Sequence, residues 1–301
     1  MKVIKRSRII KKLFLVITLL LVVIISISCK TKDYTYYKNE KYGSFKRQKY
    51  DLYLPNDMKG TKDGGHVLYI HGGAWVAGDK DGYRSEMEKN AKEGGYAYAA
   101  MNYHYISDDS DCFVIMNDVF MALDAIKKKA KENDIELTKV LLTGGSAGAH
   151  IALLYAYAYS QIEPFYSPIV PTCVVSYSGP AHIINKDYYQ MEALSGQAYD
   201  LFSKLSGFRY TEETYEDAFP YLLKVSPTYY ASLAVPTVIC HGEKDTVVPV
   251  TDAYVLDNFL TSHYIPHDLI IFPNSNHGLE SDPDKWEEAN NLFKEYMEKY
   301  L

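Results

Sequence analysis

The sequence contains little cysteine and little tryptophan, with 4 and 2 residues in a chain of 301. No group of cysteines and histidines has the spacing of a zinc site, so neither a metal nor another cofactor is indicated. A basic excess is also missing, because 32 Lys and Arg stand against 38 Asp and Glu. With no basic stripe beyond the first dozen residues, the chain gives no reason to expect a nucleic-acid partner.

A long hydrophobic segment is absent as well. The apolar run at residues 13–25 is shorter than the roughly 20 residues that a membrane-spanning helix needs. It follows a basic stretch and precedes small residues and Cys29, which is the order of a secretory signal. Because the segment resembles a bacterial lipobox, although Ser26 departs from it, residues 1–29 are predicted to be a lipoprotein signal peptide with Cys29 as the lipidated residue. A plain signal peptide or anchor with a chance cysteine is the alternative.

Residues 30–45 are polar and rich in Tyr and Lys, as expected of a tether between a membrane anchor and a folded domain. The lipoprotein interpretation predicts an exported protein of a bacterial cell envelope, periplasmic or surface-exposed and attached to a membrane by its lipid. The folded domain is then expected over residues 46–301.

Three cysteines remain after Cys29, namely Cys112, Cys173 and Cys240. Their number is odd, and the last two lie in apolar, strand-like runs. We therefore expect buried free thiols rather than a disulfide framework.

What the chain does contain is a regular alternation of strand-like and helix-like segments. The strand-like segments are residues 49–54, 66–70, 96–101, 139–143, 173–177, 238–240 and 269–272, and the helix-like ones are 82–93, 111–131, 149–159, 250–260 and 284–300. The first strand ends at Pro55 and has the character of an edge strand. The alternation predicts an α/β fold, a mostly parallel sheet with helices on both faces.

Residues 180–228 interrupt this alternation and are rich in Tyr, Ser, Asp and Glu, with helix-like pieces at 188–194 and 211–219. One interpretation is a lid over the C-terminal edge of the sheet, where open α/β folds bind ligands. The other is an ordinary pair of surface helices.

A candidate nucleophile is Ser146, in the segment Gly144-Gly145-Ser146-Ala147-Gly148. An apolar strand precedes this segment and a small-residue helix follows it, which is the setting of a nucleophile elbow. Such a turn holds the serine in a strained backbone conformation, and side chains two residues away would clash. The hydroxyl is then presented at a helix N-terminus, where developing negative charge is favoured.

A second glycine-containing loop, His71-Gly72-Gly73-Ala74-Trp75, follows the strand-like run that ends at Ile70. In acyl transfer the carbonyl oxygen becomes an oxyanion and needs fixed donors. The backbone amides of Gly73, Ala74 and Ala147 are the predicted donors. His71 is expected to be a structural hydrogen-bonding residue rather than a base.

These two segments together resemble the hormone-sensitive-lipase-like and feruloyl-esterase-like branch (BD-FAE type) of the α/β hydrolases, a family of serine esterases. Asp51-Leu52-Tyr53-Leu54-Pro55 is similar to an early strand of that branch, and the similarity extends from about residue 45 to the C-terminus. Ala74 departs from the commoner fourth glycine of the upstream loop, although an alanine amide can still donate. The resemblance implies an α/β-hydrolase fold with a helical insertion and the order serine, acid, histidine.

The acid and the base follow from that order and from their positions after late strands. Asp245 lies in the loop after residues 237–240, where its carboxylate can orient an imidazole. Glu243 is the rival acid, and the resemblance favours Asp245. His277 lies on a polar loop after the last strand-like run, where the resemblance implies the base.

The resemblance thus implies a serine-dependent carboxylic ester hydrolase that works through an acyl-enzyme, on small esters or on acetylated or feruloylated glycans. A serine peptidase of the same fold is one alternative, and a non-catalytic surface binding protein is another.

Overall fold

The computed structural model describes residues 33–161, 166–194 and 196–301. Cys29 and the predicted signal peptide lie outside these residues. Within them, no helix combines the length and the hydrophobicity that crossing a membrane requires. One unit, Tyr34–Leu301, contains the whole described fold.

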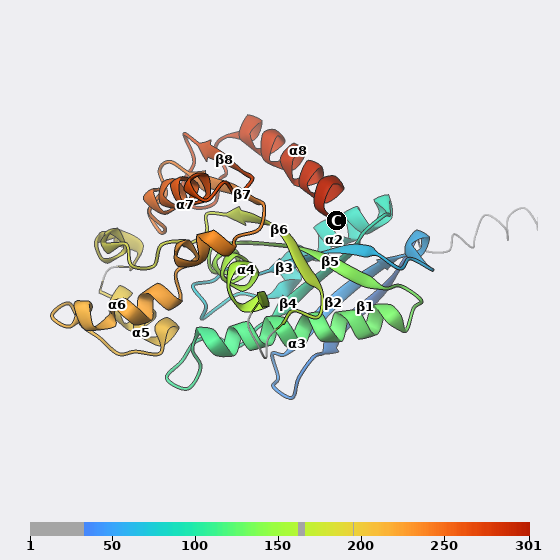
Figure 1. The fold of residues 1–301 in the computed structure, drawn as a ribbon, viewed down its shortest axis with the longest axis horizontal. Coiled ribbons are helices and arrows are strands. Elements are labelled where there is room, and N and C mark those ends of the chain that lie inside the picture. Colours follow the sequence, from blue (N-terminus) through green and yellow to red (C-terminus); the bar gives the residue numbers. More distant parts are fainter. Residues whose placement is uncertain (1–32, 162–165, 195) are drawn as a thin grey trace, which may run out of the picture. The chain divides into compact units, whose positions relative to one another are not determined.

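The centre of this unit is an eight-stranded sheet in the order β1-β2-β4-β3-β5-β6-β7-β8 (Figure 1). The strands are β1 Tyr34–Lys41, β2 Lys49–Pro55, β3 Gly64–Ile70, β4 Ala97–Asn102, β5 Leu137–Gly145, β6 Val170–Tyr177, β7 Thr237–Gly242 and β8 His267–Phe272. β1 pairs antiparallel with β2 and β2 with β4, and the later pairs are parallel. The predicted α/β fold with a mostly parallel sheet is confirmed.

Helices cover both faces of the sheet, which explains why strands such as β3 are buried along their whole length. These helices are α2 Arg84–Glu93, α3 Cys112–Lys131, α4 Ala147–Tyr157, α7 Thr251–Ser262 and α8 Pro283–Tyr300. Side chains of α3, α4 and α7 join one hydrophobic cluster, and those of α2 and α8 join another. Figure 1 shows α3 and α8 on opposite sides of the sheet.

The longest of these helices begins where the sequence predicts it to begin. The Asp111 side chain accepts hydrogen bonds from the amides of Phe113 and Val114, and so caps α3. Three lysines lie in its last turn, where they complement the helix dipole. The thiols of Cys112, Cys173 and Cys240 are buried and free, as predicted.

The predicted tether is wrong from Tyr34 onward, because these residues form strand β1 at the edge of the sheet. The tyrosines that gave this segment a polar character point into the domain. Tyr36 stacks on Tyr53 at 4.2 Å and donates a 2.7 Å hydrogen bond to the buried carboxylate of Asp51. The fold therefore starts at Tyr34 rather than at residue 46, and β2 is an interior strand rather than the predicted edge strand.

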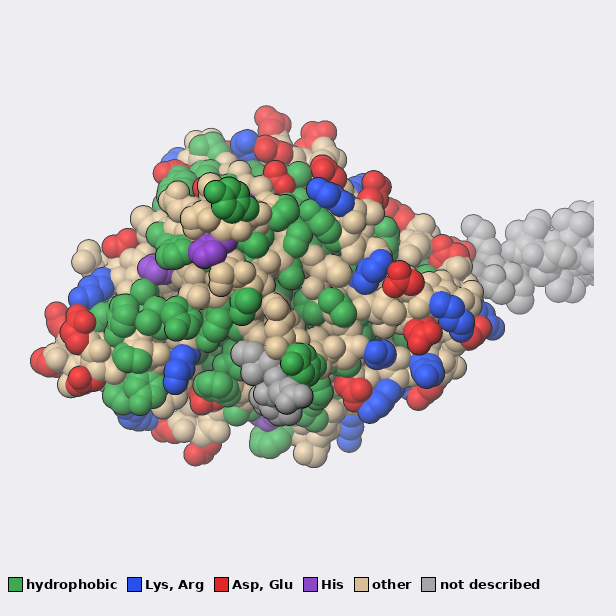
Figure 2. All heavy atoms as spheres, in the orientation of Figure 1, with side chains coloured by type: hydrophobic (Ala, Val, Ile, Leu, Met, Phe, Trp, Pro, Cys, Tyr) green, Lys and Arg blue, Asp and Glu red, His purple; other side chains and the backbone are tan. Residues whose placement is uncertain are grey.

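The insertion, residues 180–228, contains two α-helices, α5 Ala198–Ser206 and α6 Tyr215–Lys224. Short 3-10 turns precede and follow them at η4 Lys186–Gln190, η5 Glu192–Leu194 and η6 Pro227–Leu233. The sequence predicts helical pieces near η4, η5 and α6 but misses α5. Exposed hydrophobic side chains of this region include Phe219, Tyr221 and Tyr229, and Figure 2 shows hydrophobic side chains gathered over the end of the face where α5 and α6 lie in Figure 1.

A buried carboxylate on α7 fixes the start of the insertion. Asp252 accepts hydrogen bonds from the amides of Ala181 at 2.9 Å and His182 at 2.8 Å. It also accepts from the Tyr188 hydroxyl at 2.5 Å and from the Asn185 side chain at 3.0 Å. Every one of these partners is a donor, which favours the charged carboxylate, whereas burial raises the pKa of Asp252.

Candidate active site

Ser146 lies in the turn between β5 and α4, at φ 56° and ψ −124°. A non-glycine residue adopts this region only under strain, so the strained conformation expected from the sequence is present. The glycines on either side of Ser146 lie where a side chain would clash, as expected from the sequence. A Cβ on Gly148 would lie 2.0 Å from the carbonyl oxygen of Ile70, and one on Gly144 would lie 2.3 Å from the same atom.

The loop after β3 approaches this turn closely. A Cβ on Gly72 would lie 3.3 Å from the Cβ of Ser146, so the loop after β3 and the Ser146 turn are adjacent in space. Gly73 has φ 110°, and the next residues Ala74 and Trp75 have φ 50° and 60°. Among the described residues no hydrogen bond uses the amides of Gly73 or Ala74.

The third predicted donor, Ala147, is the first residue of α4. Amides in the first turn of a helix have no partner within the helix, so they are available to a ligand. Ala147 and the loop that contains Gly73 therefore both lie close to Ser146. This is an arrangement in which several N–H groups can face one oxygen atom.

Two buried histidines support these loops. His71 donates from Nδ1 to the Gly72 carbonyl at 2.7 Å and receives a 3.2 Å contact on Nε2 from Arg47. His150 accepts from the Trp75 indole at 3.1 Å. Burial lowers the pKa of both histidines to about 4, so they are neutral near pH 7. The prediction that His71 is a structural hydrogen-bonding residue agrees with these contacts.

The predicted acid and base are in direct contact. His277 Nδ1 lies 2.8 Å from Asp245 Oδ2, and the Asp245 side chain has no exposed surface. Burial by itself would raise the pKa of Asp245, but the contacts with His241 and His277 and a backbone amide hold it well below its usual range. The rival acid, Glu243, is instead bound to the Tyr254 hydroxyl at 2.6 Å.

Consecutive residues at the end of β6 hold the serine turn and the histidine loop. The Tyr177 carbonyl accepts from the Ser146 amide at 2.8 Å, and the Ser178 hydroxyl donates to the His277 carbonyl at 3.0 Å. Within the described chain no hydrogen bond joins the Ser146 hydroxyl to the His277 imidazole. Such contacts are often long in enzymes without substrate and tighten in the complex.

The family model BD-FAE matches residues 50–260. The chain belongs to the BD-FAE family. This BD-FAE protein is 25% identical over 224 residues to a Mycobacterium tuberculosis protein named "Probable carboxylic ester hydrolase LipM", with 74% of the chain and 51% of the relative covered. It spans about half the length of the curated relatives that it matches first.

Solved structures share the fold of the BD-FAE protein. Esterase B of Lactobacillus rhamnosus superposes with a TM-score of 0.67 at 22% identity, covering 88% of this chain and 85% of the other. A truncated carbohydrate esterase from gut microbiota gives a TM-score of 0.66 at 18% identity, with 89% and 99% covered. At this identity the likeness establishes the α/β-hydrolase fold.

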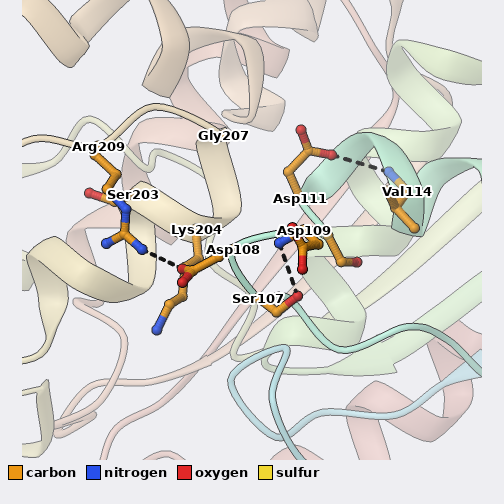
Figure 3. A pocket seen from close by; sticks show the side chains of 10 residues that line it. Ser107, Asp108, Asp109, Asp111, Val114, Ser203, Lys204, Gly207 and Arg209 are labelled. Atoms are coloured by element: carbon orange, nitrogen blue, oxygen red, sulfur yellow. Dashed lines mark hydrogen bonds and ion pairs between the residues drawn. The ribbon is translucent and has the colours of Figure 1, made fainter.

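A cavity of about 260 Å³ in the BD-FAE protein lies elsewhere, between the loop before α3 and helix α5 (Figure 3). Figure 3 shows an ion pair between Asp108 and Arg209 across this cavity, and none of the predicted catalytic residues lines it. In the described part of the chain, no cluster of three or more His, Cys, Asp or Glu side chains could hold a metal ion.

Sequence reasoning missed two contacts in the site. His241 lies 3.2 Å from Asp245 through Nε2, and Arg47 reaches His71 from the loop before β2. Neither residue is among the predicted site residues, and Arg47 lies just after the predicted tether, at the start of the predicted domain. The short spacing between His241 and Asp245 is the one signal that points to their contact.

Proposed function

We propose that this BD-FAE protein hydrolyses carboxylic esters, with Ser146 as nucleophile, His277 as general base and Asp245 as the acid that orients it. The observation that carries the proposal is the strained Ser146 on the same sheet edge as the hydrogen-bonded His277–Asp245 pair. The names of the mycobacterial relative and of the superposed esterases support the same reaction.

The proposed reaction has two steps. His277 takes the proton of the Ser146 hydroxyl through Nε2 while the serine oxygen attacks the ester carbonyl carbon. The carbonyl oxygen becomes an oxyanion and accepts hydrogen bonds from the amides of Gly73, Ala74 and Ala147. The imidazolium gives its proton to the leaving alcohol, and an acyl-enzyme remains.

Water completes the cycle. His277 removes a proton from a water molecule, which attacks the acyl carbon, and the same proton returns to the Ser146 oxygen as the acid leaves. Asp245 stays ionised throughout, because its buried carboxylate is surrounded by donors and stabilises the imidazolium of His277.

Replacing the nucleophile tests this mechanism. Ser146→Ala should lower kcat for nitrophenyl acetate by about 10⁴-fold or more, because the step that forms the acyl-enzyme is lost. A fluorophosphonate probe should label the wild type and not Ser146→Ala. Ser262→Ala, at an exposed serine of α7, is the matched control and should keep both activity and labelling. Full hydrolysis by folded Ser146→Ala would refute the serine mechanism.

The proposed substrates are small carboxylic esters or acetyl or feruloyl esters of glycans. Support comes from the family description and from the structural neighbour named as a carbohydrate esterase. Nitrophenyl esters, acetylated and feruloylated oligosaccharides and aminoacyl amides should be compared as substrates. Cleavage of the amides alone would favour a peptidase, and no cleavage of any compound would favour a binding protein.

We also propose that Cys29 carries a lipid that anchors the protein in a bacterial cell envelope. The support is the order of basic, apolar and small residues over positions 1–29. Palmitate supplied to an expressing bacterium should label the full chain and not Cys29→Ser. Equal labelling of the two would contradict the anchor.

A further inference from the structure

The Asp245 carboxylate is held on both of its oxygens. Oδ1 accepts from the amides of Val247 at 2.8 Å and Val248 at 3.0 Å. Oδ2 faces two imidazoles, His277 Nδ1 at 2.8 Å and His241 Nε2 at 3.2 Å. The two amides and His277 Nδ1 donate hydrogen bonds to the carboxylate, and His241 Nε2 lies close beside Oδ2.

The contacts of His241 define where its hydrogen lies. Nε2 hydrogen-bonds the Val248 carbonyl at 3.1 Å and lies 3.2 Å from Asp245 Oδ2, and both of these atoms only accept. Nε2 must therefore carry the hydrogen. Nδ1 is buried without a hydrogen-bond partner in the described chain, so a hydrogen there would have no acceptor.

His241 thereby connects both ends of the turn that presents the acid. Its N–H binds the carbonyl of Val248, and the amide of the same Val248 binds Asp245 Oδ1. Its Nε2 also lies 3.2 Å from Oδ2, the oxygen that His277 contacts. Rotation of the carboxylate would break the contacts with His241 and the amides together, so this arrangement limits it.

We propose that His241 is a positioning residue, which holds the Asp245 carboxylate in the orientation that receives the Nδ1–H of His277. The inference rests on the proposed function and adds a fourth side chain to its acid and base. Among the described residues no hydrogen bond joins His241 to the serine turn, so its proposed action is through Asp245. The alternative is a purely structural role, in which His241 only fills space at the end of β7.

Two substitutions separate these roles. His241→Leu fills a similar space without a donor, whereas the side-chain amide of His241→Gln can place an N–H near the position of Nε2. We expect His241→Leu to lower kcat for nitrophenyl acetate between about tenfold and 100-fold, as small displacements of catalytic groups do. KM should change less than about twofold, and His241→Gln should recover most of kcat.

The decisive measurement is a double-mutant cycle with Asp245→Asn, in which residual turnover is read from the rate of fluorophosphonate labelling. If His241 acts through Asp245, His241→Leu should slow the wild type but slow Asp245→Asn by less than about twofold. His66→Leu is the matched control, because His66 is an equally buried histidine, on β3, that contacts Lys139 rather than the acid. It should lower the melting temperature without lowering kcat.

Equal slowing by His241→Leu in the two backgrounds would overturn the inference, as would a His241→Gln variant as slow as His241→Leu. These outcomes differ from those that would refute the proposed function. That function fails if folded Ser146→Ala remains active or if the wild type cleaves no ester, whatever the His241 variants do.

Discussion

At the scale of single residues, the Ile70 carbonyl explains why the positions two residues before and after Ser146 are glycine. Gly144 and Gly148 both face this oxygen, at distances that leave no room for a methyl group. Gly148 lies in α4, where helix propensity alone would favour alanine over glycine. Replacing Gly148 by alanine should therefore destabilise the protein through the contact with β3 but stabilise it through helix propensity.

We expect Gly148→Ala to lower the free energy of unfolding by about 2 kcal/mol or more, because the new methyl group must displace the backbone of β3. Urea denaturation measures this change. Gly82→Ala is the control, since a Cβ there meets no atom within 4 Å. A stabilised Gly148→Ala protein would show that propensity, rather than the Ile70 contact, governs the site.

The local sequence was sufficient to predict those site residues whose surroundings are formed by their neighbours in the chain. Ser146 lies between a strand and a helix that its own neighbours specify, and Asp245 and His277 each follow a short apolar strand. The contact of Arg47 with His71 depends on β1 and β2 pairing at the sheet edge, which the local pattern does not contain. Residue type gives no sign that His241 faces the acid.

Strand β1 escaped prediction because it is amphipathic through tyrosine, whose ring packs inward while its hydroxyl finds a polar partner. Tyr37 of β1, for example, donates to Asn133. Counted as polar, such residues hide the alternation that marks a strand. Helix α5 is only 9 residues long, and serines lie beside Ala198, Phe202 and Leu205 on its buried face, so its helical spacing is hard to recognise.

The insertion is anchored by one buried carboxylate and by exposed ion pairs, which should differ in strength. Asp252→Asn replaces an acceptor oxygen by a donor that faces the amides of Ala181 and His182 or the Tyr188 hydroxyl. We expect it to lower the free energy of unfolding by about 2–4 kcal/mol. Hydrogen exchange at residues 181–188 should accelerate at the same time.

Asp108→Asn is the comparison, because its ion pair with Arg209 is about two-thirds exposed on both sides. It should cost less than about 1 kcal/mol. Equal losses for the two variants would mean that Asp252 does not anchor the insertion.

At the scale of the whole molecule, buried neutral histidines set the response to acid. Burial lowers the pKa of His66, His71 and His150 to about 4, against an ordinary value near 6.5. Between these two pH values the unfolded chain binds protons that the folded chain does not. The free energy of unfolding should therefore fall as the pH decreases from about 6.5 to 4.

Urea denaturation at pH 7, 6, 5 and 4 measures this slope. His66→Asn can keep a donor for the Lys139 carbonyl but does not titrate, so it should remove up to about 3 kcal/mol of the loss. If the free energy of unfolding of His66→Asn fell with pH as steeply as that of the wild type, His66 would not be a source of the acid sensitivity.

The insertion also divides the proposed machinery along the chain. Strands β6 and β7 are neighbours in the sheet, yet the insertion lies between them in sequence. A chain cut within it would leave Ser146 on one fragment and Asp245 with His277 on the other. Neither half would hydrolyse an ester alone, and recovered hydrolysis on mixing would report that the halves had found each other, as in a split reporter enzyme.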